Sequence, residues 1–368
     1  MKTDYPADVL KVIEANGLTA EHLEHFQARI QSGSVFESNR LSPDEVRGPD
    51  ADDFTVYTAL RERAALRDAG QAALNAGRLA VLVLNGGMAT RFGGGAKGTV
   101  EVGDGRSFLA LKLLDALKAG PPPLILLMNS FATAQPTRDH LTTNDYFGYP
   151  KDRVWSFEQC VSARFTPAGD LFSSDDHESV FHGAGHGDAL YALGFRGLVG
   201  KLKAAGIKTV LVTNVDNAVA TVDPVIYGQH LSVGKPVTVE LVNRDGGDTG
   251  GAPFWYQNRL QLLEHFRLPL NADLNPPVFN TNTFWIDLSV FENTPDLTWF
   301  AVSKTVKGEP VIQFERLLGE VTSFVDTNYL CVPRHGSQSR FIPVKRPEDL
   351  NENKALILSA WARSAEAC

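Results

Sequence analysis

The chain shows two kinds of hydrophobic pattern, one typical of helices and one typical of buried strands. Residues 1–33 place apolar side chains at helical spacing, with Gly17 at a helix end and Thr19 as the cap of the next helix. Residues 56–76 predict another helix, rich in alanine, leucine and arginine. We therefore expect residues 1–77 to form an N-terminal helical segment laid on the core that follows.

From residue 79 onward, apolar runs alternate with helical stretches. The run LAVLVL at 79–84 has no polar position, which is typical of a parallel strand covered on both faces. Further strands are predicted at 123–129, 209–216, 237–243 and 283–288, and helices at 107–118 and 188–205. This order predicts an α/β fold with a doubly wound mixed sheet, whose ligands bind beyond the carboxyl ends of the strands.

Composition narrows the class of protein. The 368 residues are 43% hydrophobic and 21% charged, and the formal net charge is −8. That acidic balance disfavours nucleic acid or an anionic membrane as a partner. No apolar run approaches the ~18 residues of a membrane span. The N-terminus lacks a signal-peptide pattern, and three scattered cysteines argue against a disulfide framework. We expect a cytoplasmic protein with small-molecule substrates.

The first predicted strand ends in a glycine-rich loop, NGGMATRFGGGAKG, at residues 85–98. Glycines allow successive N–H groups to face an anion, and Arg91 and Lys97 add positive charge. The loop lacks both the Gly-Lys-Ser/Thr of a Walker loop and the G-x-G-x-x-G of a dinucleotide loop. It therefore predicts a phosphate site of another type, with a flexible surface loop as the alternative.

This loop is similar to the nucleotide-binding loop of the UDP-glucose pyrophosphorylase family, which reads G-G-x-G-T-R-x-G and then P-K-G or P-K-S. The matching residues are Gly86, Gly87, Thr90, Arg91, Gly93, Lys97 and Gly98. Ala89 replaces a glycine of that form and Ala96 replaces the proline. The resemblance implies that Asn85, Gly86 and Gly87 bind the nucleotide.

Other segments resemble motifs of the family in the same order along residues 80–350. They are MNSF (128–131), FEQ (157–159), GAGHGD (183–188), NVDN (214–217), VFNTNTFW (278–285), VIQFE (311–315) and RFIPVK (340–345). In the family the V-I-Q-x-E segment opens a helix, so we expect one at 311–321.

The resemblance also implies the fold and the domain organisation. It implies a Rossmann-like nucleotide-diphospho-sugar transferase fold of the GT-A type, with the catalytic domain over residues 78–300. Residues 301–368 are then a short C-terminal segment that completes the site. Many relatives continue into a long β-helical domain, for which we expect no room after Lys345.

The same resemblance implies roles for individual residues. Gln159 would read the uracil, since its amide offers both a donor and an acceptor, with Gly185 beside the nucleotide. Asp216 would hold Mg²⁺, which prefers a few carboxylate oxygens together with those of phosphates. Lys345 would reach the phosphates. The residues implied for the sugar phosphate are His186, Asn214, Asn280, Asn282 and Arg244.

Several of these residues have structural alternatives. Gln159 could be an ordinary surface glutamine, and Asp216 could order an Asx turn. Asp188 stands where a helix N-cap belongs. Internal hydrogen bonding is as good an account of Asn282 as a contact with a sugar hydroxyl.

One loop departs from the family pattern. Members with uridylyltransferase activity commonly carry two lysines after the strand at 237–243, where this chain has Arg244 and Thr249. Arg244 can still pair with phosphate, whereas Thr249 supplies no charge. The identity of the sugar phosphate is therefore left open.

Together the motifs imply nucleotidyl transfer, in which an NTP (UTP first) and a sugar 1-phosphate (glucose 1-phosphate first) give an NDP-sugar and pyrophosphate. The attacking oxygen is already anionic, so the site must neutralise charge rather than supply a strong base. The expected catalytic residues are Lys97, Arg91, Lys345 and Asp216. No oligomeric state is implied.

Three alternatives to this function remain. The first is the same chemistry with another base or a cyclitol phosphate. The second is a nucleotide-sugar glycosyltransferase, and the third is a nucleotide-sugar-binding protein without catalysis.

Overall fold

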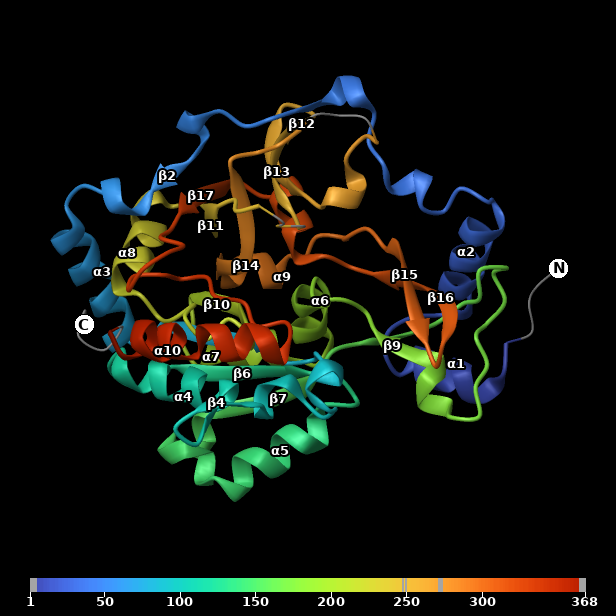
Figure 1. Cartoon of the computed structure of the whole chain (residues 1–368), viewed down its shortest axis with the longest axis horizontal. Coiled ribbons are helices and arrows are strands. Elements are labelled where there is room, and N and C mark those ends of the chain that lie inside the picture. The colour runs from blue at the N-terminus through green and yellow to red at the C-terminus, as the bar shows by residue number, and fades with distance from the viewer. Residues whose placement is uncertain (1–4, 247, 249, 271–273, 364–368) are drawn as a thin grey trace.

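The computed structural model describes residues 5–246, 248, 250–270 and 274–363. Its centre is a mixed sheet of eight strands in the order β2-β17-β11-β14-β10-β3-β6-β7 (Figure 1). These strands are β2 (Thr55–Val56), β17 (Thr327–Cys331), β11 (Val237–Asn243), β14 (Val278–Asp287), β10 (Thr209–Asn214), β3 (Leu79–Leu84), β6 (Leu124–Asn129) and β7 (Val154–Glu158). Strand β14 runs antiparallel to both of its neighbours, and the other pairs are parallel. The predicted α/β class with a mixed sheet is confirmed.

Strand β3 shows why its sequence carries no polar position. Successive side chains of a strand point to opposite faces. Leu79, Val81 and Val83 pack into one hydrophobic cluster, whereas Leu82 and Leu84 pack into another. Both faces of the strand are thus covered, as the unbroken apolar run predicts.

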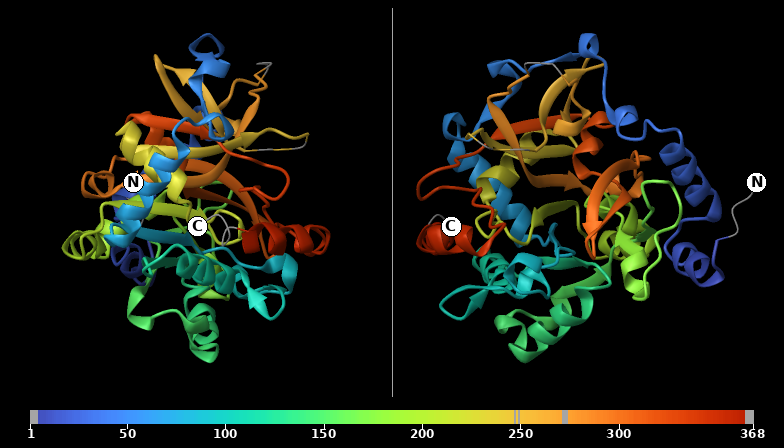
Figure 2. Two further views of the ribbon diagram at one scale, coloured as in Figure 1. Left: turned by 90° about the vertical axis from the view of Figure 1, so that its left-hand side faces the viewer. Right: turned by 45° about the vertical axis from the view of Figure 1, so that its right-hand side comes forward.

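Helices cover both faces of the sheet. One cluster includes side chains from α3 (Arg63–Asn75), α4 (Phe108–Lys118), α5 (Ala134–Thr143), α8 (Pro224–Val233) and α10 (Pro347–Arg363). The other includes side chains from α6 (Asp188–Phe195), α7 (Leu198–Ala204) and α9 (Leu288–Glu292). Figure 2 shows these helices flanking the central strands. Two smaller sheets complete this part of the fold, β1 (Val46–Arg47) with β12 (Ala252–Tyr256) and β13 (Arg259–Leu263), and β4 (Glu101–Gly103) with β5 (Arg106–Ser107).

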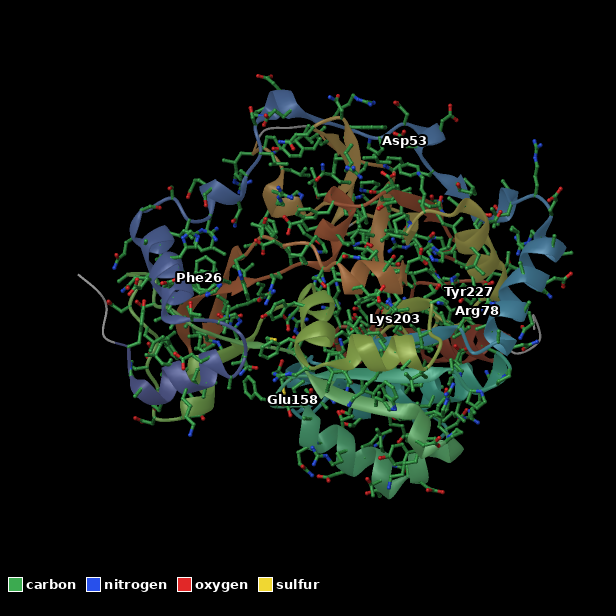
Figure 3. All side chains as sticks on the ribbon, turned by 180° about the vertical axis from the view of Figure 1, so that it is seen from behind. Phe26, Asp53, Arg78, Glu158, Lys203 and Tyr227 are labelled. Atoms are coloured by element: carbon green, nitrogen blue, oxygen red, sulfur yellow. The ribbon has the colours of Figure 1, made fainter. Side chains whose placement is uncertain are left out.

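The N-terminal helices lie in two separate places. Helices α1 (Ala7–Glu14) and α2 (Ala20–Gln31) pack on the small sheets β8 (Val161–Ala163) with β9 (Phe181–Gly183) and β15 (Phe300–Val306) with β16 (Glu309–Glu315). In this cluster the rings of Phe26 and Phe314 stack with centroids 4.2 Å apart. Figure 3 shows Phe26 at the opposite end of the molecule from Tyr227 of α8. Residues 1–77 are therefore not one layer on the core.

Helix α3 crosses α8 at very short range because each helix has a glycine at the contact. A Cβ on Gly70 would lie 1.9 Å from the carbonyl oxygen of Pro224, and a Cβ on Gly228 would lie 1.8 Å from that of Leu66. No larger residue fits either position without moving a backbone. This crossing fixes α3 against the sheet beside β2, at the far end from α1 and α2 (Figure 1).

Two segments differ from the sequence-based expectation. The predicted helix at 188–205 is two helices, because Gly197 takes a left-handed conformation with φ of +68° between them. The prediction of a helix that opens at VIQFE is wrong, since residues 311–315 belong to β16. Lys307 and Gly308, both with positive φ, form the tight turn of the β15–β16 hairpin, which commits the next residues to a strand.

The central sheet takes strands from all three predicted segments of the chain. Strand β2 comes from residues 1–77 and β17 from residues 301–368, and they pair with each other. The boundaries at 78 and 301 stay a prediction. In the part of the chain that the structure describes, no helix has the length and apolar character needed to span a membrane.

A buried ion pair joins β11 to the segment after β17. Arg340 donates from Nε and Nη2 to the two carboxylate oxygens of Glu240, at 2.7 and 2.8 Å. Glu240 is fully buried and Arg340 is 5% exposed. Trp285 donates to the same carboxylate from its indole, at 2.9 Å.

We expect Arg340→Met to lower the free energy of unfolding by about 3–5 kcal/mol, because it leaves the Glu240 carboxylate buried without its cation. Urea unfolding followed by circular dichroism measures the change. Arg259→Met is the matched control, since the Arg259–Asp326 pair is exposed and its loss should cost at most about 1 kcal/mol. Equal effects of the two substitutions would contradict this account of the buried pair.

Candidate active site

A cleft of about 720 Å³ lies at the carboxyl ends of the central strands. Leu84 of β3, Met128 of β6 and Asn214 of β10 line its floor. The opposite wall is built by β9, β15 and β16, which lie outside the central sheet. Its volume falls in the range of small-molecule sites, and its place is the one that doubly wound sheets use for ligands.

The glycine-rich loop folds back on itself at the edge of the cleft. Gly93, Gly94 and Gly95 all have positive φ, and the turn they form brings the N–H of Lys97 to the carbonyl of Gly87, at 3.1 Å. In the described chain, the N–H groups of Gly86, Gly87 and Met88 have no protein acceptor, and all three residues line the cleft. Adjacent free amides of this kind bind anions.

Lys97 and Asp216 form an ion pair in the lining of the cleft. The Nζ of Lys97 lies 2.6 Å from Oδ2 of Asp216, and both side chains are mostly buried. The two residues follow β3 and β10, which are adjacent parallel strands, and the N–H of Val215 donates to the carbonyl of Leu84 at 3.3 Å. The sheet therefore brings together a cation and a carboxylate that are 119 residues apart in the sequence.

Gln159 is held in the cleft between two glycines. Its residue is 9% exposed, and its backbone N–H donates to the carbonyl of Asn129 at 2.8 Å. A Cβ on Gly86 would lie 2.9 Å from the amide nitrogen of Gln159, and a Cβ on Gly183 would lie 1.9 Å from it. Glycine at 183 is thus required for this side-chain position. Gln159 is not the surface glutamine of the alternative reading.

His186 lines the cleft as a neutral imidazole. Burial lowers its pKa to about 4, so the ring carries no charge at neutral pH. Its Nδ1 lies 3.1 Å from the N–H of Leu318 and accepts that hydrogen, which leaves the proton on Nε2. Nε2–H is then the donor for a ligand. Gly185, with φ of +90°, also lines the cleft.

Asp188 is not the cap of the helix that follows. Helix α6 begins at Asp188 itself, after Gly187. The Asp188 carboxylate accepts the N–H of Cys160 at 2.6 Å and pairs with Nη2 of Arg316 at 2.9 Å. Since Cys160 follows Gln159, this buried pair ties the position of Gln159 to the start of α6.

The asparagines expected at the site form a chain of hydrogen bonds. Asn282, in the left-handed region at φ of +58°, donates from Nδ2 to Oδ1 of Asn214 at 2.9 Å, and its N–H donates to Oδ1 of Asn280 at 2.9 Å. Of these three, only Asn214 is among the residues that line the cleft. Asn85 is fully buried and donates to Asn129 at 2.7 Å, so its side chain supports the sheet rather than the cleft.

The remaining expected cations do not line the cleft. Arg91 and Lys345 are exposed, although the neighbour of Lys345, Val344, donates its N–H to the carbonyl of Asp216 at 3.3 Å. Arg244 donates to the carbonyl of Asp248 at 3.2 Å. Thr249 lies outside the described residues.

Sequence reasoning missed the opposite wall of the cleft, which adds the side chains of Arg164, His182, Lys304, Gln313 and Glu315. Lys304 of β15 lies 3.8 Å from Glu315 of β16 across the hairpin. The signal for this wall was the Lys307–Gly308 turn between two strand-like runs, directly before VIQFE. That turn pairs Lys304 with Val311, so the side chain of Lys304 lies on the same face of the hairpin as Gln313 and Glu315.

A divalent cation in this cleft would have one carboxylate, that of Asp216, next to the free amides of the glycine-rich loop. No cluster of three or more His, Cys, Asp or Glu side chains suited to a metal is found among the described residues. Asp216 and Glu315 are the acids that line the cleft. Mg²⁺ binds through one or two carboxylates together with substrate phosphates, so this set fits Mg²⁺ that arrives with a nucleotide.

The family model and the relatives of similar sequence carry the same name. The family model of UTP–glucose-1-phosphate uridylyltransferase matches residues 23–360. The chain is 31% identical to the enzyme of that name from Encephalitozoon cuniculi over 293 residues, which are 74% of this chain and 57% of the relative. It is 29% identical to the Saccharomyces cerevisiae enzyme, over 94% of this chain and 72% of that one. The potato enzyme is 31% identical over 74% of this chain and 60% of its own.

Solved structures share the fold. A UDP-glucose phosphorylase from Trypanosoma brucei superposes with a TM-score of 0.77 at 23% identity, covering 94% of this chain and 78% of that one. A UDP-N-acetylglucosamine pyrophosphorylase from the same organism gives a TM-score of 0.76 at 18% identity, covering 96% and 80%. The match thus spans less than two thirds of the length of the Encephalitozoon and potato relatives, and about four fifths of each of the two solved chains.

Proposed function

The chain belongs to the UTP–glucose-1-phosphate uridylyltransferase family, and on that premise we propose that it transfers a uridylyl group from UTP to glucose 1-phosphate. The products are UDP-glucose and pyrophosphate. The observation that carries the proposal is the pairing of Lys97 with Asp216 beside the free amides of the glycine-rich loop. A triphosphate placed there meets a cation, a metal-binding carboxylate and backbone N–H groups at once.

In the proposed reaction, a phosphate oxygen of glucose 1-phosphate attacks the α-phosphorus of UTP in line. The bond from the α-phosphorus to the oxygen that bridges to the β-phosphorus breaks, and pyrophosphate leaves with that oxygen. Mg²⁺, held by Asp216, would neutralise part of the phosphate charge. The amides of Gly86, Gly87 and Met88 and the ammonium of Lys97 hold the triphosphate. Lys304, on the opposite wall, adds a second cation to the cleft that would hold the triphosphate.

We expect Gln159→Ala to lower the preference for UTP over CTP by about 10- to 100-fold, because the alanine leaves the uracil edge without its donor and acceptor. The ratio of kcat/KM for the two nucleotides, measured by pyrophosphate release, gives the change. Gln135→Ala, at an exposed position of α5, is the matched control and should leave the ratio unchanged. A ratio that stays the same in the Gln159 variant would remove this residue from base recognition.

The loop after β11 favours a second candidate, the same chemistry with another acceptor. Family members commonly carry lysines there, whereas this chain has a closed clamp in which Arg334 pairs with Asp248 at 2.6 Å and with Asp245 at 2.8 Å. Arg244 bonds to the backbone of Asp248 and does not line the cleft. An acceptor that is not glucose 1-phosphate is compatible with this change.

A pyrophosphate-release panel over the four NTPs and a set of sugar and cyclitol phosphates tests both candidates. We expect the largest kcat/KM with UTP and glucose 1-phosphate. A larger value with another acceptor would replace glucose 1-phosphate and keep the reaction. No pyrophosphate from any pair, in a protein that binds UTP by calorimetry, would overturn the proposed activity.

A further inference from the structure

A lysine is buried inside the fold next to the turn that carries Asp216. Lys112 of α4 is 5% exposed, although lysine is among the residues least often buried. Its ammonium donates to Oγ1 of Thr213 at 3.0 Å, to the carbonyl of Asn217 at 2.7 Å and to the carbonyl of Ala220 at 2.9 Å. These acceptors occupy all three of its hydrogens. All three belong to the end of β10 or to the turn that follows.

Helix α4 holds the turn at a second point. Asp115, one helical turn after Lys112, accepts the N–H of Val222 at 2.9 Å. The two side chains thus bind the near and far parts of residues 213–222, and Asp216 lies between the bound positions. Residues 215–222 form no helix or strand, so these side-chain hydrogen bonds help to define the shape of the turn.

The turn after β10 also binds residues 340–344, the segment that follows β17. Asn217 donates from Nδ2 to the carbonyl of Arg340 at 3.0 Å and accepts the N–H of Ile342 at 3.1 Å. Val344 donates its N–H to the carbonyl of Asp216 at 3.3 Å. A displacement of the turn would therefore move both the Asp216 carboxylate and residues 340–344.

Burying the ammonium of Lys112 here costs desolvation free energy. Burial lowers the pKa of Lys112 to about 7, opposed by the carboxylates of Asp115, Asp216 and Glu240 and assisted by Arg340. An apolar side chain of similar volume would avoid that cost. It would leave the carbonyl of Ala220 without its donor, and the carbonyl of Asn217 would keep only the N–H of Ala220, at 3.2 Å. The benefit of a lysine here is the fixed geometry of the turn.

We propose that Lys112 is a positioning residue for nucleotidyl transfer, which fixes the turn after β10 so that Asp216 faces Lys97 and the triphosphate site. This inference rests on the proposed function. It adds a residue that touches no substrate and that belongs to none of the motifs shared with the family.

The test compares Lys112→Met with Lys118→Met. Lys118 lies on the same helix and is anchored as well, with Nζ 3.0 Å from the carbonyl of Trp361, but it does not contact the turn. We expect kcat/KM for UTP to fall about 100-fold in the Lys112 variant, with a melting temperature close to that of the native chain. The Lys118 variant should keep kcat/KM within about threefold. Lys112→Arg, which keeps a cation and several donors, should recover part of the loss.

Hydrogen exchange of the substrate-free protein reads the geometry without relying on activity. Backbone amides in peptides covering 213–222 and 340–344 should exchange faster in Lys112→Met and at the native rate in Lys118→Met. Native exchange in both peptides of Lys112→Met, or kcat/KM within threefold of native, would overturn the proposal. So would equal losses in the two variants.

Two further outcomes are separable. If Lys112→Met does not fold, Lys112→Gln, which retains two donors, takes its place in both measurements with the same expectations. If the native chain releases no pyrophosphate with any pair of substrates, the proposed function fails. The exchange rates of residues 213–222 then decide alone whether Lys112 fixes the turn.

Discussion

Lys97→Ala is expected to reduce kcat about 10³-fold while leaving the protein folded. The reaction brings two polyanions together, and most of the catalysis must come from charges and N–H groups that neutralise the crowded phosphates. Lys97 is the cation of the glycine-rich loop that lines the cleft and faces Asp216. The loss of one such preorganised group typically costs 10²–10³ in rate. Initial-rate kinetics of pyrophosphate release at saturating UTP measure it.

Folding should change little in this variant because the remaining Asp216 side chain lines the cleft and is 22% exposed. The matched control is Lys203→Ala, at a position labelled in Figure 3. It removes a lysine from an exposed pair with Glu292 and should keep native kcat. A Lys97 variant that retains more than about a third of native kcat would remove Lys97 from the mechanism.

Asp216→Asn is expected to lower kcat/KM by at least about 10²-fold. The amide keeps the shape of the side chain and the backbone contact with Val344, but it removes the charge that a divalent cation needs. The metal concentration for half-maximal rate should rise as well. Mn²⁺ binding with UTP, followed by electron paramagnetic resonance, measures metal affinity without turnover.

Asp326→Asn serves as the control for Asp216→Asn, since Asp326 is an exposed acid that pairs with Arg259 and does not line the cleft. It should leave the rate and the metal dependence unchanged. Native metal affinity in Asp216→Asn would show that the cation is held by other groups.

The elements that the sequence predicts best are those specified by neighbouring residues. The strand expected at 79–84 is β3, Leu79–Leu84, because six apolar residues in a row require cover on both faces. The helix expected at 107–118 is α4, Phe108–Lys118. The glycine-rich loop was recognisable because its function depends on backbone, and glycines record backbone conformation in the sequence.

The site residues that escaped prediction depend on contacts between distant segments. Lys304 looks like an ordinary charge on an exposed hairpin until β15 and β16 are placed against the cleft. Lys112 interrupts the apolar face of its helix, and its acceptors lie more than 100 residues away. Asp188 has the sequence position of a cap, but its partner Arg316 directly follows β16, more than 120 residues later. No local pattern encodes such pairs.

The two aromatic rings that stack in the outlying cluster set an order for folding during synthesis. Phe26 is made almost 290 residues before Phe314, and the two lie 4.2 Å apart in the finished protein. Arg29 likewise donates to the carbonyl of Trp299. A growing chain must therefore carry α1 and α2 with part of their apolar faces uncovered until the hairpin has been synthesised. During that interval the uncovered apolar surface is exposed to chaperones and to aggregation.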